Sequence, residues 1–305
     1  MRRLRNGPTT AFTRAGTLSR MTRDIRRIDH TGILSRNLDQ LEQRYLALGF
    51  TLSPRSRHLL SERPGEKPVL GGTANRCALF GQTYIELLGI VDPAAPDPWR
   101  TKEVPDGFRI FYVGSDDVDA QARRLTEAGV PIMGVRSLER EVDTVDGPRA
   151  MRARALHVDP RFTPHGYIGI AHQLTPEYLH QPRYLTHPNG ARAIASVLVV
   201  VDDAELGDTV ERYTRILDTS PVARDDRRVL ELPAGRLEFV AASRAAETLP
   251  GVVPRGLAAM SIAVADVNAA RRLVDGNGIA TVTTGDGFLV SADDAFGSAL
   301  FFTAS

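Results

Sequence analysis

The chain has few of the residues that stabilise secreted or membrane proteins. Of its 305 residues only one is cysteine, Cys77, so no intramolecular disulfide can form, which suits a reducing cytoplasm. No apolar run approaches the roughly 18 residues needed to cross a bilayer. Lysine and arginine number 38 against 37 aspartate and glutamate, so the net charge of +1 predicts neither nucleic-acid nor membrane binding. We expect a cytoplasmic globular protein of one or two domains.

The first residues differ in composition from the rest. They are rich in arginine, carry no acidic residue before Asp24, and lack the apolar stretch of a signal peptide. Such a composition buries too little apolar surface to become ordered, so we expect a disordered leader over residues 1–25. A transit peptide and a translation start at Met21 are alternatives that the sequence leaves open.

One pattern occurs four times along the chain: an apolar strand, an aspartate, a short helix and a turn. The aspartates are Asp39, Asp119, Asp208 and Asp266. Ten residues after each comes a residue expected to end the helix: Gly49, Gly129, Asp218 and Gly276. Each copy closes with a further apolar strand: Tyr84–Ile90, Tyr167–His172, Arg236–Ala241 and Ala299–Thr303.

These copies predict an α+β fold made of βαβββ modules. A single module cannot bury both faces of its small sheet, but two modules side by side form a curved sheet with helices outside and a concave cleft inside. Four modules therefore predict two domains, which we place at residues 26–190 and 191–305. A doubly wound parallel sheet fits less well, because no glycine-rich phosphate turn follows the first strand.

The four copies are chemically unequal. All seven histidines, the only cysteine and the only tryptophan occur no later than His187. We therefore expect the chemistry in the first domain and regard the second as degenerate. In the second domain only Glu238 resembles Glu86, and we expect it to pair with Arg236 or another arginine.

Three residues of the first domain could carry chemistry. His30 lies in an early strand, Glu86 in a strand whose two faces both look buried, and His172 at a strand end. A buried carboxylate needs a cation as partner. Taken singly, each residue also has a purely structural interpretation. His30 could be a hydrogen-bonded core histidine, Glu86 could pair with Arg76 or Arg109, and His172 could cap a strand end.

Together the three residues predict a metal site on the concave surface. Two imidazoles and one carboxylate, with open positions for water, suit Fe(II), and Mn, Zn, Co or Ni would also fit. His30, Glu86 and His172 would be the ligands, with Glu86 and His172 also catalytic. The open positions would bind two neighbouring substrate oxygens while the metal stabilises an enolate or activates dioxygen.

Four more residues are predicted to contact substrate. His58 lies on an expected loop that could cover the cleft. Asn75 and Arg76 lead into a strand, and they and Arg109 could bind a substrate oxygen or carboxylate. A surface position for His58 and structural ion pairs for the arginines are the alternatives. The remaining histidines are expected to be mostly solvated: His157, His165, His180 and His187.

Several short motifs carry a family resemblance. They are Asp-His-Thr-Gly at Asp29–Gly32, Gly-Thr-Ala-Asn at Gly72–Asn75, Tyr-Ile-Glu-Leu-Leu at Tyr84–Leu88 and the stretch His172–Gly190. With the four modules, they resemble the glyoxalase-like branch of the vicinal oxygen chelate superfamily over about residues 26–304. That superfamily includes glyoxalase I, extradiol dioxygenases and metal-free drug-sequestering proteins such as bleomycin resistance proteins, so its fold does not choose the reaction.

The sequence departs from the superfamily pattern at two ligand positions. Counting back from the helix aspartate places Ile110 where the first strand of the second module would supply a ligand. His172 stands about two residues beyond the usual last-strand glutamate, on what we take to be the same strand face. Glyoxalase I itself is therefore a weaker match.

The resemblance implies two functions of different classes. The first is a divalent-metal enzyme, of dioxygenase or lyase/isomerase type, acting on a small molecule with vicinal oxygens. The second is a metal-free protein that binds or sequesters a small molecule. Either function allows a homodimer, and neither requires nucleic acid or a membrane.

Overall fold

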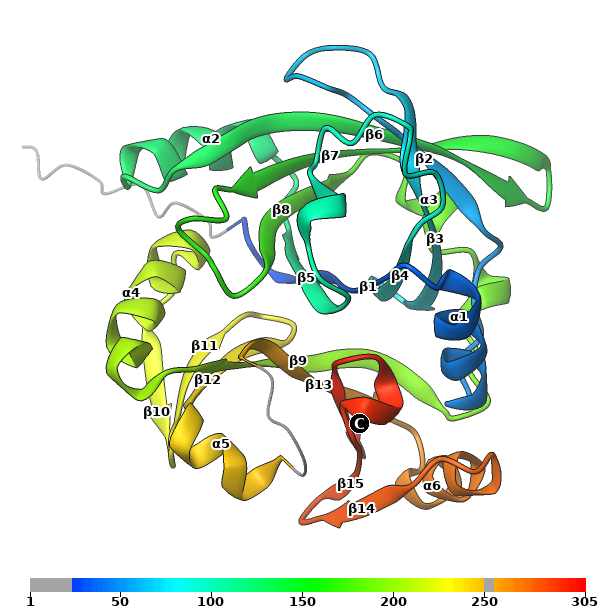
Figure 1. The fold of residues 1–305 in the computed structure, drawn as a ribbon, viewed down its shortest axis with the longest axis vertical. Coiled ribbons are helices and arrows are strands. Elements are labelled where there is room, and N and C mark those ends of the chain that lie inside the picture. Colours follow the sequence, from blue (N-terminus) through cyan, green and yellow to red (C-terminus); the bar gives the residue numbers. More distant parts are fainter. Residues whose placement is uncertain (1–23, 250–254) are drawn as a thin grey trace, which may run out of the picture.

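The computed structural model describes residues 24–249 and 255–305 (Figure 1). The predicted leader lies outside the described residues up to residue 23. Its last two residues belong to the fold: Asp24 accepts hydrogen bonds from the Ser115 hydroxyl and the Asp116 backbone, and Ile25 is buried. No helix in the described ranges is long and apolar enough to span a membrane.

Residues from Arg27 to Gln173 form a closed barrel with strand order β1-β4-β3-β2-β6-β7-β8-β5. Its elements are β1 (Arg27–Ser35), α1 (Leu38–Ala47), β2 (Ser56–Leu60), β3 (Val69–Phe80), β4 (Thr83–Ile90), η1 (Thr101–Glu103), β5 (Gly107–Gly114), α2 (Val118–Glu127), β6 (Ile132–Thr144), β7 (Gly147–Val158) and β8 (Tyr167–Gln173), followed by α3 (Pro176–Leu179) and η2 (Pro182–Tyr184).

The barrel consists of the two predicted βαβββ modules. β1 pairs in parallel with β4, and β5 pairs in parallel with β8. An antiparallel β1–β5 contact joins the modules on one side, and β2 pairs with β6 on the other, with Leu59 opposite Glu139. The expected cleft is therefore a closed interior, because pairing both sheet edges leaves no open side.

The ends of the first two helices are set by local residues, which either accept hydrogen bonds from the backbone N–H groups of the first turn or allow the chain to turn away after the last. The side chain of Asn37 accepts a hydrogen bond from the first turn of α1, and Asp117 does the same for α2. Gly49 and Gly129 follow these helices with φ of 85° and 69°, a conformation that glycine adopts without strain. In the fourth module the predicted helix end at Gly276 is confirmed, since α6 ends at this residue, and Gly278 makes the turn that follows with a φ of 77°.

The rest of the chain forms an open sheet of eight strands in the order β10-β11-β12-β9-β13-β16-β15-β14. Its elements are β9 (Ala191–Val201), η3 (Asp203–Glu205), α4 (Leu206–Leu217), β10 (Pro221–Arg224), β11 (Arg227–Glu231), β12 (Arg236–Ala241), α5 (Ala242–Thr248), β13 (Gly256–Val264), α6 (Val267–Gly276), β14 (Thr281–Thr284), β15 (Gly287–Val290), η4 (Asp293–Ala295) and β16 (Ala299–Ala304).

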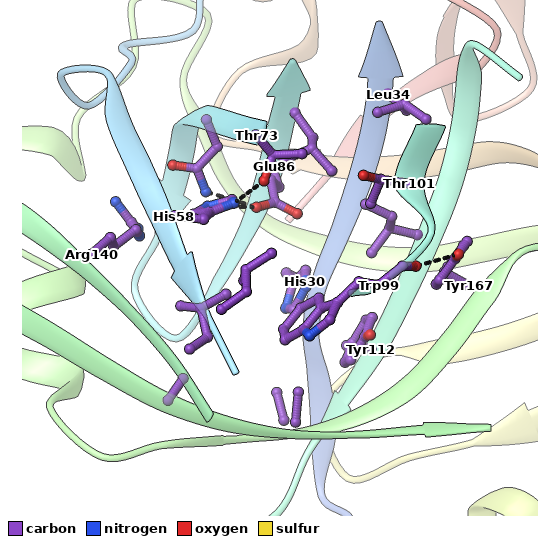
Figure 2. A pocket seen from close by; sticks show the side chains of 18 of the residues that line it. His30, Leu34, His58, Thr73, Glu86, Trp99, Thr101, Tyr112, Arg140 and Tyr167 are labelled. Atoms are coloured by element: carbon purple, nitrogen blue, oxygen red, sulfur yellow. Dashed lines mark hydrogen bonds and ion pairs between the residues drawn. The ribbon is translucent and has the colours of Figure 1, made fainter. Parts of the chain in front are cut away.

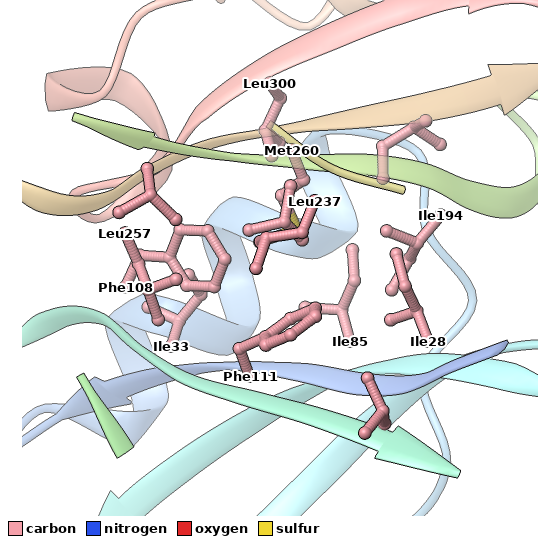
Figure 3. Close-up of a cluster of buried hydrophobic side chains, with 14 of the residues drawn as sticks. Ile28, Ile33, Ile85, Phe108, Phe111, Ile194, Leu237, Leu257, Met260 and Leu300 are labelled. Atoms are coloured by element: carbon pink, nitrogen blue, oxygen red, sulfur yellow. The ribbon is translucent and has the colours of Figure 1, made fainter. Parts of the chain in front are cut away.

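The two halves share one hydrophobic core. Figure 3 shows Ile85 and Phe111 on the outer face of the barrel meeting Leu237 and Met260 of the second sheet. All four side chains are fully buried. Because one face of β1, β4 and β5 is used in this contact, their alternate residues point into the barrel.

The second sheet packs one face against the barrel. Its other face is covered by a compact apolar cluster that includes Leu198 and Val240 of the sheet and Ala245 and Leu249 at α5. The second half therefore lies against the outside of the barrel wall.

Candidate functional site

The barrel interior contains a pocket lined by polar and apolar side chains. Its cavity volume is about 70 Å³. Leu34, Leu88 and Ile110 belong to one apolar cluster of the barrel, and Cys77 and Met151 belong to another.

Glu86 is the central carboxyl group of this pocket (Figure 2). Along β4, Ile85 and Leu87 point into the core between the domains, so Glu86 points into the barrel. Its side chain is 11% exposed. Asn75 Nδ2 donates to Glu86 Oε1 at 2.7 Å, and His58 Nε2 lies 3.7 Å from the same oxygen. No arginine or lysine of the described residues forms an ion pair with it, so the predicted partners Arg76 and Arg109 are wrong.

His30 lines the same pocket from β1. Its ring is stacked between the rings of Tyr84 and Tyr112, with centroid distances of 4.6 and 4.7 Å. A register shift between Ile28 and His30 leaves Asp29 as an extra residue, so that Asp29 and His30 are not on the ordinary strand alternation. The sequence pattern carried no sign of this bulge.

Asp29 fixes the orientation of the His30 ring. Its Oδ1 lies 2.7 Å from His30 Nδ1 and accepts a second bond from Gln173 Nε2 at 3.0 Å. Burial acts to raise the pKa of Asp29, but the bonds from His30 and Gln173 outweigh it and lower the pKa. An ionised carboxylate only accepts hydrogen bonds, so His30 Nδ1 carries a proton that it donates to Asp29.

His58 is inside the barrel, and its predicted position on a covering loop is wrong. It belongs to β2 and is 4% exposed. Its Nδ1 is 2.9 Å from Thr73 Oγ1, whereas its Nε2 is buried without a hydrogen bond among the described residues. Burial lowers the pKa of His58 to about 4, so this ring is neutral at physiological pH.

His172 does not join His30 and Glu86. Its neighbours Ala171 and Gln173 line the pocket, so His172 points to the outer face of β8. The register explains the error: Glu86 lies opposite Gly32 in β1, and Gly169 lies opposite Tyr112, the counterpart of Gly32 in β5, so the counterpart of Glu86 is Gly169. The expected two-residue offset of His172 is a three-residue offset, which reverses the face.

The same register confirms the other missing ligand position. His30 pairs with Tyr112 and Gly32 pairs with Ile110, so Ile110 is the counterpart of His30 in the second module and Tyr112 is the counterpart of Gly32. Among the described residues no three His, Cys, Asp or Glu side chains are placed to hold a metal ion. The predicted triad of His30, Glu86 and His172 therefore does not fit a metal, because only two of its members share the pocket.

The predicted substrate residues divide into two groups. His58 and Asn75 both face the pocket. Arg76 instead pairs with Glu42 at 3.3 Å and donates to the Ser53 carbonyl, which makes it a structural residue. Arg109 borders the pocket, but its guanidinium donates to the carbonyls of residues 105 and 106 and holds the connecting loop.

Sequence reasoning missed four residues of the barrel interior. Trp99 lies in the segment between β4 and η1 and lines the pocket with Tyr112 and Arg140. His157 was expected to be solvated, but it is 1% exposed and packs edge-on against Trp99 at 4.5 Å. Hydrophobic alternation along β7 could have indicated His157, whereas nothing local marks Arg140.

Glu238 behaves as expected for a structural carboxylate. Arg236 Nε donates to it at 2.6 Å, and Arg227 forms a second ion pair. Burial acts to raise the pKa of Glu238, but the two arginines outweigh it and lower the pKa. The second sheet therefore neutralises the carboxylate whose counterpart in the barrel has no arginine partner.

Comparisons with known proteins agree with this architecture. The sequence profile of the glyoxalase-like domain family matches residues 28–217, more than half of the chain. No curated protein matches the sequence. A hypothetical protein from Staphylococcus aureus has a similar structure, with a TM-score of 0.59 and 13% identity over 90% of this chain and 99% of its own.

Two further solved structures share the fold. A mutant of 4-hydroxymandelate synthase from Streptomyces coelicolor matches with a TM-score of 0.56 and 12% identity, over 92% of this chain and 94% of its own. A fusion of a xylose isomerase-like TIM barrel with 4-hydroxyphenylpyruvate dioxygenase matches with a TM-score of 0.54 and 13% identity, over 85% of this chain and 40% of its own. At these identities the likeness concerns the fold alone.

Proposed function

This chain belongs to the glyoxalase-like domain family, and from that premise we propose that its barrel encloses a small molecule whose polar group interacts with Glu86. One observation carries the proposal: a buried carboxyl group, held by Asn75, faces the pocket and forms no ion pair with an arginine or lysine in the part of the chain that the structure describes. Such a group is costly to bury unless a ligand completes its interactions.

The polar side chains of the pocket favour a ligand that donates a hydrogen bond or a proton. Asn75 occupies one side of Glu86 Oε1, which leaves the carboxyl group able to accept from a hydroxyl or amino group. The stacked rings of Tyr84, His30 and Tyr112 and the side chain of Trp99 provide a surface for a flat apolar body. In an enzyme, Glu86 at this position would act as a general base.

The test uses Trp99, the only tryptophan, as a reporter inside the pocket. Benzyl alcohol and benzyl methyl ether share a body, but only the alcohol can donate to Glu86. We expect Glu86→Gln to weaken binding of the alcohol about fivefold, since a charged acceptor contributes about 1 kcal/mol more than a neutral one. The ether should bind both proteins equally.

Glu238→Gln is the matched control, because it removes the corresponding carboxylate from the second sheet. It should leave Trp99 titrations unchanged. Equal binding of alcohol and ether to the unmodified protein, or an equal effect of the two substitutions, would contradict the role given to Glu86.

A metal-dependent enzyme of dioxygenase or lyase/isomerase type is the second candidate. The bond between Asp29 and His30 favours it, since metal-binding histidines commonly donate their other ring nitrogen to a carboxylate. The absence of a three-residue cluster in the described part of the chain weighs against it. Metal analysis of protein purified without chelators decides: a stoichiometric metal that is lost in His30→Ala would establish this candidate over the first.

A further inference from the structure

Arg140 is a buried cation inside the barrel. It lies on β6 opposite Met151 of β7, is 3% exposed and lines the pocket. Its only hydrogen bond is a long one, from Nη2 to Cys77 Sγ at 3.8 Å, and it forms no ion pair with any carboxylate in residues 24–249 and 255–305. Burial raises the pKa of Cys77 to about 12, so this partner is a neutral thiol.

Three other arginines of the barrel differ from Arg140, because each has a carboxylate partner. Arg76 pairs with Glu42, Arg152 with Glu139, and Arg154 with Asp119. A guanidinium taken out of water needs an anion to compensate the lost hydration. Arg140 alone among these four faces the pocket without one.

Glu86 does not serve as the anionic partner of Arg140. Arg140 and Glu86 line the same pocket, yet no ion pair joins them among the described residues. Glu86 Oε1 is already bonded to Asn75. The pocket therefore offers a separated cation and carboxyl group to one molecule.

We infer that the ligand of the barrel is a small carboxylic acid, whose carboxylate binds the Arg140 guanidinium while its hydroxyl or amino group faces Glu86. The planar guanidinium fork matches a carboxylate with two parallel hydrogen bonds. This inference rests on the proposed function, because it assumes that the ligand is enclosed by the barrel and adds its chemical class.

Phenylacetate and phenylacetamide test the inference, because they differ in charge and little in shape. Titration of the unmodified protein, followed by Trp99 fluorescence, should give about 10- to 100-fold tighter binding of phenylacetate, the range expected for a charge-assisted bond. Arg140 also borders a second cavity beneath α3, which Trp99 does not line, so the signal reports binding in the barrel.

Substitutions then assign the preference to Arg140. Arg140→Met removes the charge but keeps an unbranched apolar side chain, and it should abolish the preference for phenylacetate, while Arg140→Lys should retain part of it. Arg152→Met is the control on the outer face, where Arg152 pairs with Glu139, and should bind both probes as the unmodified protein does. Circular dichroism checks that each variant is folded.

The outcomes separate this inference from the proposed function. Equal affinity of the unmodified protein for both probes overturns the inference and leaves the enclosing pocket intact; this comparison needs no variant. An equal loss of affinity for both probes in a folded Arg140→Met protein also overturns the inference, since Arg140 would then only shape the barrel. If neither probe changes Trp99 fluorescence, the enclosing pocket itself is refuted.

Discussion

Replacing His157 should make the protein less sensitive to acid. This histidine lies on β7 in the barrel wall, where Trp99 and Tyr112 meet it edge-on at 4.5 and 5.7 Å. Neither ring nitrogen has a hydrogen-bond partner among the described residues. Burial, with smaller effects of the charges of Arg136 and His30, lowers the pKa of His157 from 6.5 to about 3.

The lowered pKa sets the direction and size of the effect. The unfolded chain takes up a proton as the pH falls below about 6.5, whereas the folded protein keeps His157 neutral until about pH 3. The stability contributed by the neutral ring is therefore present above pH 6.5 and is lost progressively toward pH 3. Between pH 7 and pH 5 the expected loss is about 2 kcal/mol.

His157→Leu removes the titrating group at similar volume. Urea unfolding at pH 7 and pH 5 gives the free energy of unfolding of both proteins at each pH. The loss between the two pH values should be about 2 kcal/mol smaller in the variant, whatever the substitution does to packing. The same loss in both proteins would refute the reasoning, because it would mean that the ring is hydrogen-bonded in the folded state.

Two further substitutions test the packing that shapes the pocket and joins the domains. In Gly169→Ala, the added Cβ would lie 2.4 Å from Tyr112 Cε1, so Tyr112 must move; we expect a loss of about 1–3 kcal/mol and weaker probe binding by Trp99 titration. In Phe111→Ala, a fully buried side chain leaves the core shared by both halves, which should cost about 3–5 kcal/mol. Because that core is shared, denaturant should unfold both halves together, and separate transitions would contradict this.

The sequence alone determined the modules. Apolar residues at helical spacing and helix-ending glycines such as Gly49 are local signals, so the helix that follows the first strand of each module could be placed to within a few residues. Composition also placed the chemistry in the first half, and the strand pattern predicted that Glu86 is buried.

Only the tertiary structure decided which residues meet. A strand alternates its faces at every residue, so an error of one position moved His172 from the pocket to the outer surface. A bulge at Asp29 changed the same alternation in the first strand. Arg140 looks in sequence like any other arginine, and only the pairing of strands distant along the chain leaves it buried without a carboxylate. Local patterns specify elements, whereas charge balance in the barrel depends on contacts between residues far apart in the chain.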